Sequence, residues 1–220
     1  MSEKEPTAES THQEGCCCGA EDPAAGDAYR CSDDAYAGPM RKVDVDFLYL
    51  DLACCDRCQG ADKRVEAAVE RCRGVLAACG YDLALNSIHV DSAKLAKAYR
   101  FESSPTIRVN GADICPSVEE NDCACCSDMS DTAVTCRIFP FNGAYYEVPP
   151  TDLIVRGIME AVMQDRQSDD TARPYELPEN LARFYAGVQE KSRAEAGCCC
   201  GDASAAKPRK GAASEDSCCC

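Results

Sequence analysis

The spacing of apolar residues changes several times between residues 43 and 163, and each change predicts a new element. Apolar side chains fill residues 43–52 at alternating and then consecutive positions, as in a strand that is buried on both faces. Residues 61–79 then place small and apolar side chains at steps of three and four, which predicts an amphipathic helix. Gly80 follows and ends this helix, because glycine readily adopts a positive φ.

The rest of this region continues the alternation of strands and helices. Its patterns predict, in chain order, a strand, a short helix, a strand that follows Pro105, a hairpin around Asn142-Gly143 and a helix that starts after two prolines: residues 82–90, 92–100, 106–109, 137–148 and 149–162. A cysteine-rich insert, residues 115–136, interrupts the series. The order β-α-β-α-β, insert, hairpin, α predicts the α/β class with a central sheet.

The flanking segments differ in composition from this domain, which we place at residues 42–165. Residues 1–41 are acidic and lack apolar periodicity, so we expect a disordered arm. Residues 166–195 are predicted to form a linker and a short docking helix over residues 177–193. Residues 196–220 are predicted to be a disordered cysteine-rich tail.

The charge of the chain argues against two classes of partner. The 220 residues include 23 basic and 38 acidic ones, for a formal net charge of −15. Such a surface repels phosphate backbones and anionic lipid, so we expect neither nucleic acid nor a membrane as a partner. No apolar run has the length of a membrane span, and the N-terminus has no hydrophobic segment, so a cytoplasmic location is expected.

Cysteine is the most unusual feature of the composition, with 20 residues. Nine of them form three uninterrupted triplets: Cys16, Cys17 and Cys18; Cys198, Cys199 and Cys200; and Cys218, Cys219 and Cys220. Adjacent cysteines pair poorly with each other because a disulfide requires a particular separation and orientation of the two residues. Several thiolates on one segment can instead surround a soft ion. The triplets therefore predict binding of soft metal or metalloid ions, and we include all nine among the candidate ligands.

Two further motifs carry a resemblance to a known family. Cys55-Asp56-Arg57-Cys58 follows the first strand and opens the first helix, and Ser104-Pro105 precedes a later strand. This pairing resembles the thioredoxin-like superfamily, in which CxxC opens a helix and a cis-proline loop faces it. The phrases DLACCDRCQGAD and FESSPTIRVNG are also similar to an uncharacterised bacterial family of thioredoxin-like domains of unknown function. The resemblance covers about residues 43–163 and implies a three-layer fold with a central mixed sheet, the cysteine-rich insert being an inserted loop.

The position of this CxxC motif has chemical consequences of its own. A thiol at a helix N-terminus meets unpaired N–H groups and the positive end of the helix dipole, which favour thiolate. In an oxidoreductase, Cys55 as the more exposed sulfur would attack a disulfide or an oxidised metalloid, Cys58 would resolve the intermediate, and Pro105 would face the pair. The Asp-Arg dipeptide between the cysteines and the absence of tryptophan argue against that activity.

A second group of cysteines lies in the insert. Cys123 and Cys126 form another CxxC motif, and Cys136 follows ten residues later. We interpret these three as ligands of a tetrahedral zinc site, with Cys115 or Cys125 as the fourth, against the alternative of a disulfide or free-thiol loop.

Two functions follow from these patterns. The first is the handling of a soft ion such as arsenite, mercuric, cuprous, cadmium or zinc species by clustered thiolates. The second is thiol–disulfide exchange with a protein partner through Cys55 and Cys58. Zinc or another soft ion is the expected cofactor; no organic cofactor is expected, since no dinucleotide or phosphate-binding motif occurs.

Overall fold

The computed structural model describes residues 38–115, 117–166 and 174–197 of the chain. The predicted arm, residues 1–41, lies outside the described residues except for its last four. The predicted tail, residues 196–220, lies outside the described residues except for its first two. All three cysteine triplets therefore also lie outside the described residues. Among the described residues, no helix has the length and apolar character needed to cross a membrane.

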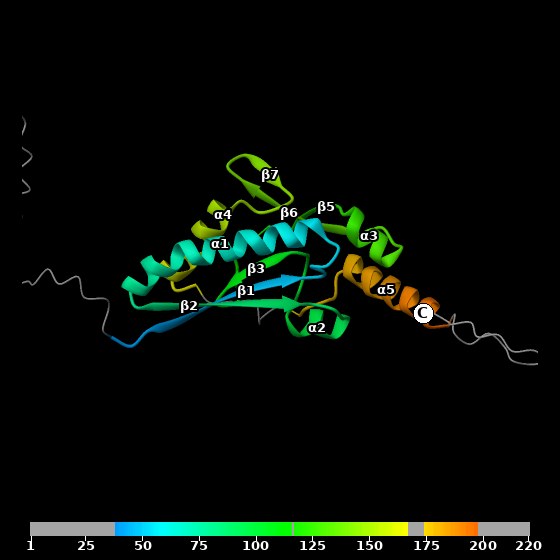
Figure 1. The fold of residues 1–220 in the computed structure, drawn as a ribbon, viewed down its shortest axis with the longest axis horizontal. Helices are drawn as coiled ribbons and strands as arrows, with labels where there is room; N and C mark the ends of the chain where they lie inside the picture. Colours follow the sequence, from blue (N-terminus) through cyan, green and yellow to red (C-terminus); the bar gives the residue numbers. More distant parts are fainter. Residues whose placement is uncertain (1–37, 116, 167–173, 198–220) are drawn as a thin grey trace, which may run out of the picture. The chain divides into compact units, whose positions relative to one another are not determined.

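A mixed four-stranded sheet forms the centre of the domain (Figure 1). Its strands are β1 (Arg41–Tyr49), β2 (Tyr81–His89), β3 (Thr106–Val109) and β4 (Ala112–Asp113), in the order β2-β1-β3-β4. β1 runs parallel to β2 and antiparallel to β3. The predicted α/β class with a mixed sheet is therefore confirmed.

Strand β1 buries one face through Val43, Val45 and Phe47, whereas its other face carries the half-buried Asp44 and Asp46 and is buried only from Leu48 on, so the predicted burial of both faces holds only at its end. Val43, Val45 and Phe47 belong to one core, together with residues of two helices, α1 (Asp56–Ala78) and α4 (Thr151–Met163). These two helices pack side by side (Figure 1). Leu48 and Leu50 belong to a second core. Gly80, with a φ of +84°, follows α1 at the predicted position.

The second core brings together segments that are far apart in the sequence. It contains apolar residues of α2 (Ala93–Ala98) and of α5 (Glu179–Gly197), a helix that overlaps the predicted docking helix. α5 packs against α2 and against α3 (Ala124–Ser130), a short helix of the insert. Tyr185 of α5 donates a hydrogen bond from its hydroxyl to the carbonyl of Val90, at 2.9 Å.

The insert has more structure than a loop. It contains β5 (Glu119–Asp122), α3 and the first two residues of β6 (Thr135–Phe141), and β7 (Ala144–Tyr146) follows. These strands form a second sheet in the order β5-β6-β7. β5 has the sequence Glu-Glu-Asn-Asp, which contains none of the residues that favour strands. It is a strand because its backbone pairs with β6.

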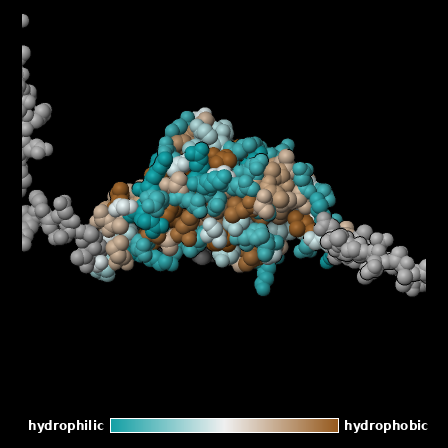
Figure 2. Space-filling view, in the orientation of Figure 1, coloured by the Kyte–Doolittle hydropathy of each residue, from teal (hydrophilic) through white to brown (hydrophobic). Residues whose placement is uncertain are grey.

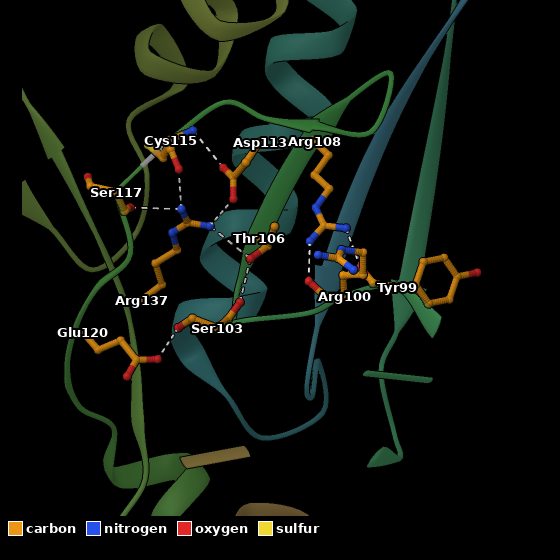
Figure 3. Close-up of polar contacts among 10 residues, drawn as sticks. All are labelled: Tyr99, Arg100, Ser103, Thr106, Arg108, Asp113, Cys115, Ser117, Glu120 and Arg137. Atoms are coloured by element: carbon orange, nitrogen blue, oxygen red, sulfur yellow. Dashed lines mark hydrogen bonds and ion pairs between the residues drawn. The ribbon is translucent and has the colours of Figure 1, made fainter. Parts of the chain in front are cut away.

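A buried arginine joins the insert to the central sheet (Figure 3). Arg137 of β6 is fully buried, and its guanidinium reaches Thr106 Oγ1 at 3.1 Å and Asp113 Oδ2 at 2.7 Å. The same group donates to the carbonyls of Cys115 and Ser117. Burying a charge is costly unless it is paired, so these partners fix the position of β6 relative to β3 and β4.

Candidate metal centre

Each CxxC motif begins a helix. Cys55 is the N-cap of α1 and Cys123 is the N-cap of α3, both with extended backbone conformation. Cys58 and Cys126 follow three residues later in the first turn of each helix. Since residues three apart lie on the same side of a helix, both thiols of each motif face inward.

The two motifs meet in one buried group of sulfurs, which we call the five-thiol cluster: Cys55, Cys58, Cys123, Cys126 and Cys136. Each of these residues is at most 2 % exposed. The sulfurs of Cys55, Cys123 and Cys126 all lie within 4.8 Å of one another. Cys126 Sγ is 4.0 Å from Cys55 Sγ, and Cys136 Sγ is 3.5 Å from Cys126 Sγ. None of the ten described cysteines forms a disulfide.

Apolar side chains enclose the cluster. The same core contains Leu48 of β1, Leu50 just after it and, from α5, Leu181, Phe184 and Tyr185. α5 fits closely on α3 because Gly187 has no side chain: a Cβ there would lie 2.0 Å from the carbonyl oxygen of Ser130. On the face shown in Figure 2, a moderately hydrophobic patch covers the beginning of α1 near α3. The thiols are therefore shielded from water by α3, α5 and the sheet.

The loop that precedes β3 contacts the cluster. The Ser104–Pro105 peptide bond is cis. Ser104 Oγ accepts a hydrogen bond from the Leu50 amide at 3.1 Å and lies 3.4 Å from Cys58 Sγ. Its hydroxyl hydrogen therefore remains available for the Cys58 sulfur. The pKa of Cys58 is lowered by hydrogen bonding from Cys55 and, to a smaller degree, from Ser104.

The thiols do not ionise independently. Hydrogen bonds from Cys126, Cys136 and Cys55 lower the pKa of Cys123. The pKa of Cys126 is raised by hydrogen bonding with Cys123 and, to a smaller degree, with Cys136 and Cys55, and by burial. Hydrogen bonding to Cys123 also raises the pKa of Cys55. The hydrogen bonds among these thiols therefore favour a thiolate at Cys123 over one at Cys126 or Cys55.

Arg57, between the cysteines of the first motif, binds the insert. Its guanidinium donates to Asn121 Oδ1 at 2.5 Å, to the Asp122 carbonyl at 2.7 Å and to Glu147 Oε1 at 2.6 Å. Its side chain is only 12 % exposed. Because Asp122 directly precedes Cys123, this arginine fixes the start of α3 against the start of α1.

The structure overturns two expectations about Cys55. It is not the more exposed sulfur of its pair, because both Cys55 and Cys58 are 0 % exposed beneath the insert and α5. Its helix N-terminus also does not make it the thiolate, because the Cys55 pKa is raised by the hydrogen bond with Cys123. The sequence could not indicate either point, since the covering segments lie 60 or more residues further along the chain.

The other candidate residues lie at different distances from the cluster. Cys115 is buried in a separate small core with Phe139 and Leu153, and burial raises its pKa. Cys125 is half-buried and packs against the outside of the second core. Pro105 lies directly after Ser104, next to Cys58. Residues 16–18, 198–200 and 218–220 lie outside the described residues.

Sequence reasoning treated the two CxxC motifs as separate sites and missed two arginines. The structural role of Arg57 had no signal beyond its place in the motif. Arg137 did have a signal in the sequence, because it is the one charged residue in a strand of mostly apolar and aromatic residues, which is unusual.

The fold and the thiols define an α/β protein with a candidate metal-binding site, in which Cys55, Cys123 and Cys126 are placed to hold an ion. The chain belongs to the family described as Domain of unknown function (DUF2703), whose model matches residues 43–158. Comparison with curated proteins and with solved structures gave no match. The matched residues include every member of the five-thiol cluster but not α5.

Proposed function

We propose that this protein binds a soft metal or metalloid ion at the five-thiol cluster and holds that ion or passes it on. The observation that carries the proposal is the convergence of three buried sulfurs, those of Cys55, Cys123 and Cys126, within 4.8 Å of one another. Thiolates at a metal–sulfur distance of about 2.3 Å in a tetrahedral site are about 3.8 Å apart. The separation of 4.0 Å between the sulfurs of Cys126 and Cys55 is close to that value.

The alternative of thiol–disulfide exchange fits less well. An exchanging thiol must be reached by a substrate sulfur and must ionise to attack it. Cys55 and Cys58 are both 0 % exposed, and the pKa of Cys55 is raised by its hydrogen bond with Cys123. A protein disulfide could approach them only after the insert and α5 had moved. An ion is small enough to need a much smaller opening.

The remaining features extend this proposal. The cysteine triplets at residues 16–18, 198–200 and 218–220 would capture ions from solution or from small thiol carriers and deliver them to the cluster. Such a function requires reduced thiols, which favours a cytoplasmic location. We also infer a relationship of the scaffold to the thioredoxin-like superfamily. The order of its central strands and the contact between Cys58 and the Ser104-Pro105 loop support this relationship.

Cadmium titration tests the proposal. The protein is the full-length chain with all nine triplet cysteines replaced by serine, so that only the domain can bind. Cadmium–thiolate absorption should report one ion per chain, and Cys123→Ser should weaken binding by more than about tenfold because a ligand is lost. Cys79→Ser, which changes an exposed cysteine at the end of α1, is the matched control and should bind as before. Absence of binding, or equal binding by Cys123→Ser, would refute the proposal.

A further inference from the structure

The geometry and the surroundings of the five-thiol cluster narrow the class of ion, an inference that rests on the function proposed above. Three sulfurs, rather than four, form the mutually close group: Cys55, Cys123 and Cys126. Three thiolates are the number that trivalent arsenic or antimony binds, in a pyramid with a lone pair at its apex. A zinc or cadmium ion in a structural thiolate site takes four.

The net charge of the bound complex distinguishes these two kinds of ion more clearly than the number of ligands does. A trivalent ion with three thiolates is a neutral complex, whereas a divalent ion with four thiolates carries a charge of −2. The cluster is buried among apolar side chains such as Leu48 and Phe184. An uncompensated charge in such surroundings is costly, so the neutral complex is favoured.

The nearby charged groups do not compensate for an anionic complex. Arg57, within the first motif, is paired with Glu147. Arg137, next to Cys136, is paired with Asp113. Asp51 adds a negative charge near Cys55, whose amide donates to Asp51 Oδ1 at 3.3 Å. Helix N-termini contribute only about half a positive charge each, which is too little to balance −2.

We propose that the cluster is selective for trivalent arsenic or antimony, bound by Cys55, Cys123 and Cys126, while Cys58 and Cys136 are not ligands. The reaction is a condensation without any redox change. Neutral arsenous acid, As(OH)₃, exchanges its three hydroxyl groups for three cysteine sulfurs. Each thiol proton leaves with one hydroxyl, so three waters are released and three As–S bonds replace three As–O bonds.

Competition between arsenite and zinc tests the selectivity without any change to the cluster. The full-length chain with serine in place of the nine triplet cysteines is mixed with equal concentrations of both ions, and the bound ion is identified by native mass spectrometry. We expect one arsenic per chain, with a mass that reports the loss of three hydrogens, and a preference over zinc of at least about tenfold. A preference for zinc would overturn the selectivity but leave the proposed function standing. Binding of neither ion, together with no binding of cadmium, would refute both.

Single substitutions then identify the ligands. Cys55→Ser, Cys123→Ser and Cys126→Ser should each abolish arsenite binding, whereas Cys58→Ser and Cys136→Ser should retain it. A site of four thiolates would instead lose binding in Cys136→Ser. Cys115→Ala, a buried cysteine in a separate core, is the control for the general effect of losing a thiol. Far-ultraviolet circular dichroism checks that each variant is folded. If a variant does not fold, the competition experiment still decides the class of ion, because it leaves the cluster unchanged.

Discussion

Substitution of Gly187 by alanine should open the five-thiol cluster. Gly187 is buried on the face of α5 that contacts α3, and an added Cβ would lie 2.0 Å from the Ser130 carbonyl oxygen. Ordinary contact at such a position begins at 3.4 Å, so the two helices must separate by about 1.4 Å (3.4 − 2.0). A backbone carbonyl cannot rotate away as a side chain can, so α5 must move away from α3. This movement loosens the apolar contacts that cover the thiols.

The expected cost follows from that displacement. Overpacking a close interface costs about 1–3 kcal/mol, and we expect the upper half of that range because the opposing atom is backbone. With a urea dependence of about 1–3 kcal/mol per M, the unfolding midpoint should decrease by on the order of 1 M. Alkylation of Cys123 and Cys126 in the native protein, followed by mass spectrometry, should become faster. Cys72, which is buried in the other core, should stay protected.

A second Gly→Ala substitution is the matched control. Gly74 is exposed within α1, and a Cβ there would meet no atom within 4 Å. Alanine should therefore stabilise the protein by about 0.5–1 kcal/mol, because it is the better helix former. If Gly187→Ala left both the urea midpoint and the labelling of Cys123 unchanged while Gly74→Ala stabilised the chain, the reasoning about α5 would be wrong.

Three further predictions concern charged and polar groups. Arg57→Gln should weaken ion binding by about 10- to 100-fold, because the start of α3 loses its anchor, while Arg71→Gln, which removes an exposed ion pair, should not; cadmium titration compares them. Arg137→Met should cost about 3–5 kcal/mol in urea unfolding, because Asp113 and two carbonyls lose their partner; a loss below 1 kcal/mol would contradict the assigned role. Burial raises the pKa of Tyr175 to about 12 from its ordinary value of 10.0. The protonated hydroxyl therefore contributes stability that is full below about pH 10 and lost as the pH rises through 12. Tyr175→Phe should lose less stability than the parent over that interval; equal losses would exclude this contribution.

The part of the chain that closes the cluster lies outside the family match. The matched stretch, residues 43–158, supplies all five thiols, whereas α5 covers them from residues 179–197. Removal of α5 would take Leu181 and Phe184 out of the second core and expose the apolar residues that they pack among there. Because its side chains form part of the second core, α5 belongs to the domain although it lies outside the family match.

Local pattern determined much of the fold. The run from Val43, the helical spacing that leads to Gly80, the turn at Asn142-Gly143 and the helix after Pro150 all act through contacts between near neighbours, and each element occurs where the pattern predicted it. β5 had no such signal, because a strand of acidic and amide residues forms only through pairing with β6.

The sequence alone also determined which residues could form a thiol site, since it contains two CxxC motifs and 20 cysteines. Only the tertiary structure decided that Cys55 and Cys123, 68 positions apart, share one buried cluster. That outcome depends on long-range contacts: the buried ion pair of Arg137, the hydrogen bonds of Arg57 and the close packing of Gly187 on Ser130. Such contacts join segments whose local patterns are independent, so no reading of either motif by itself could place the two together or show that both would be buried.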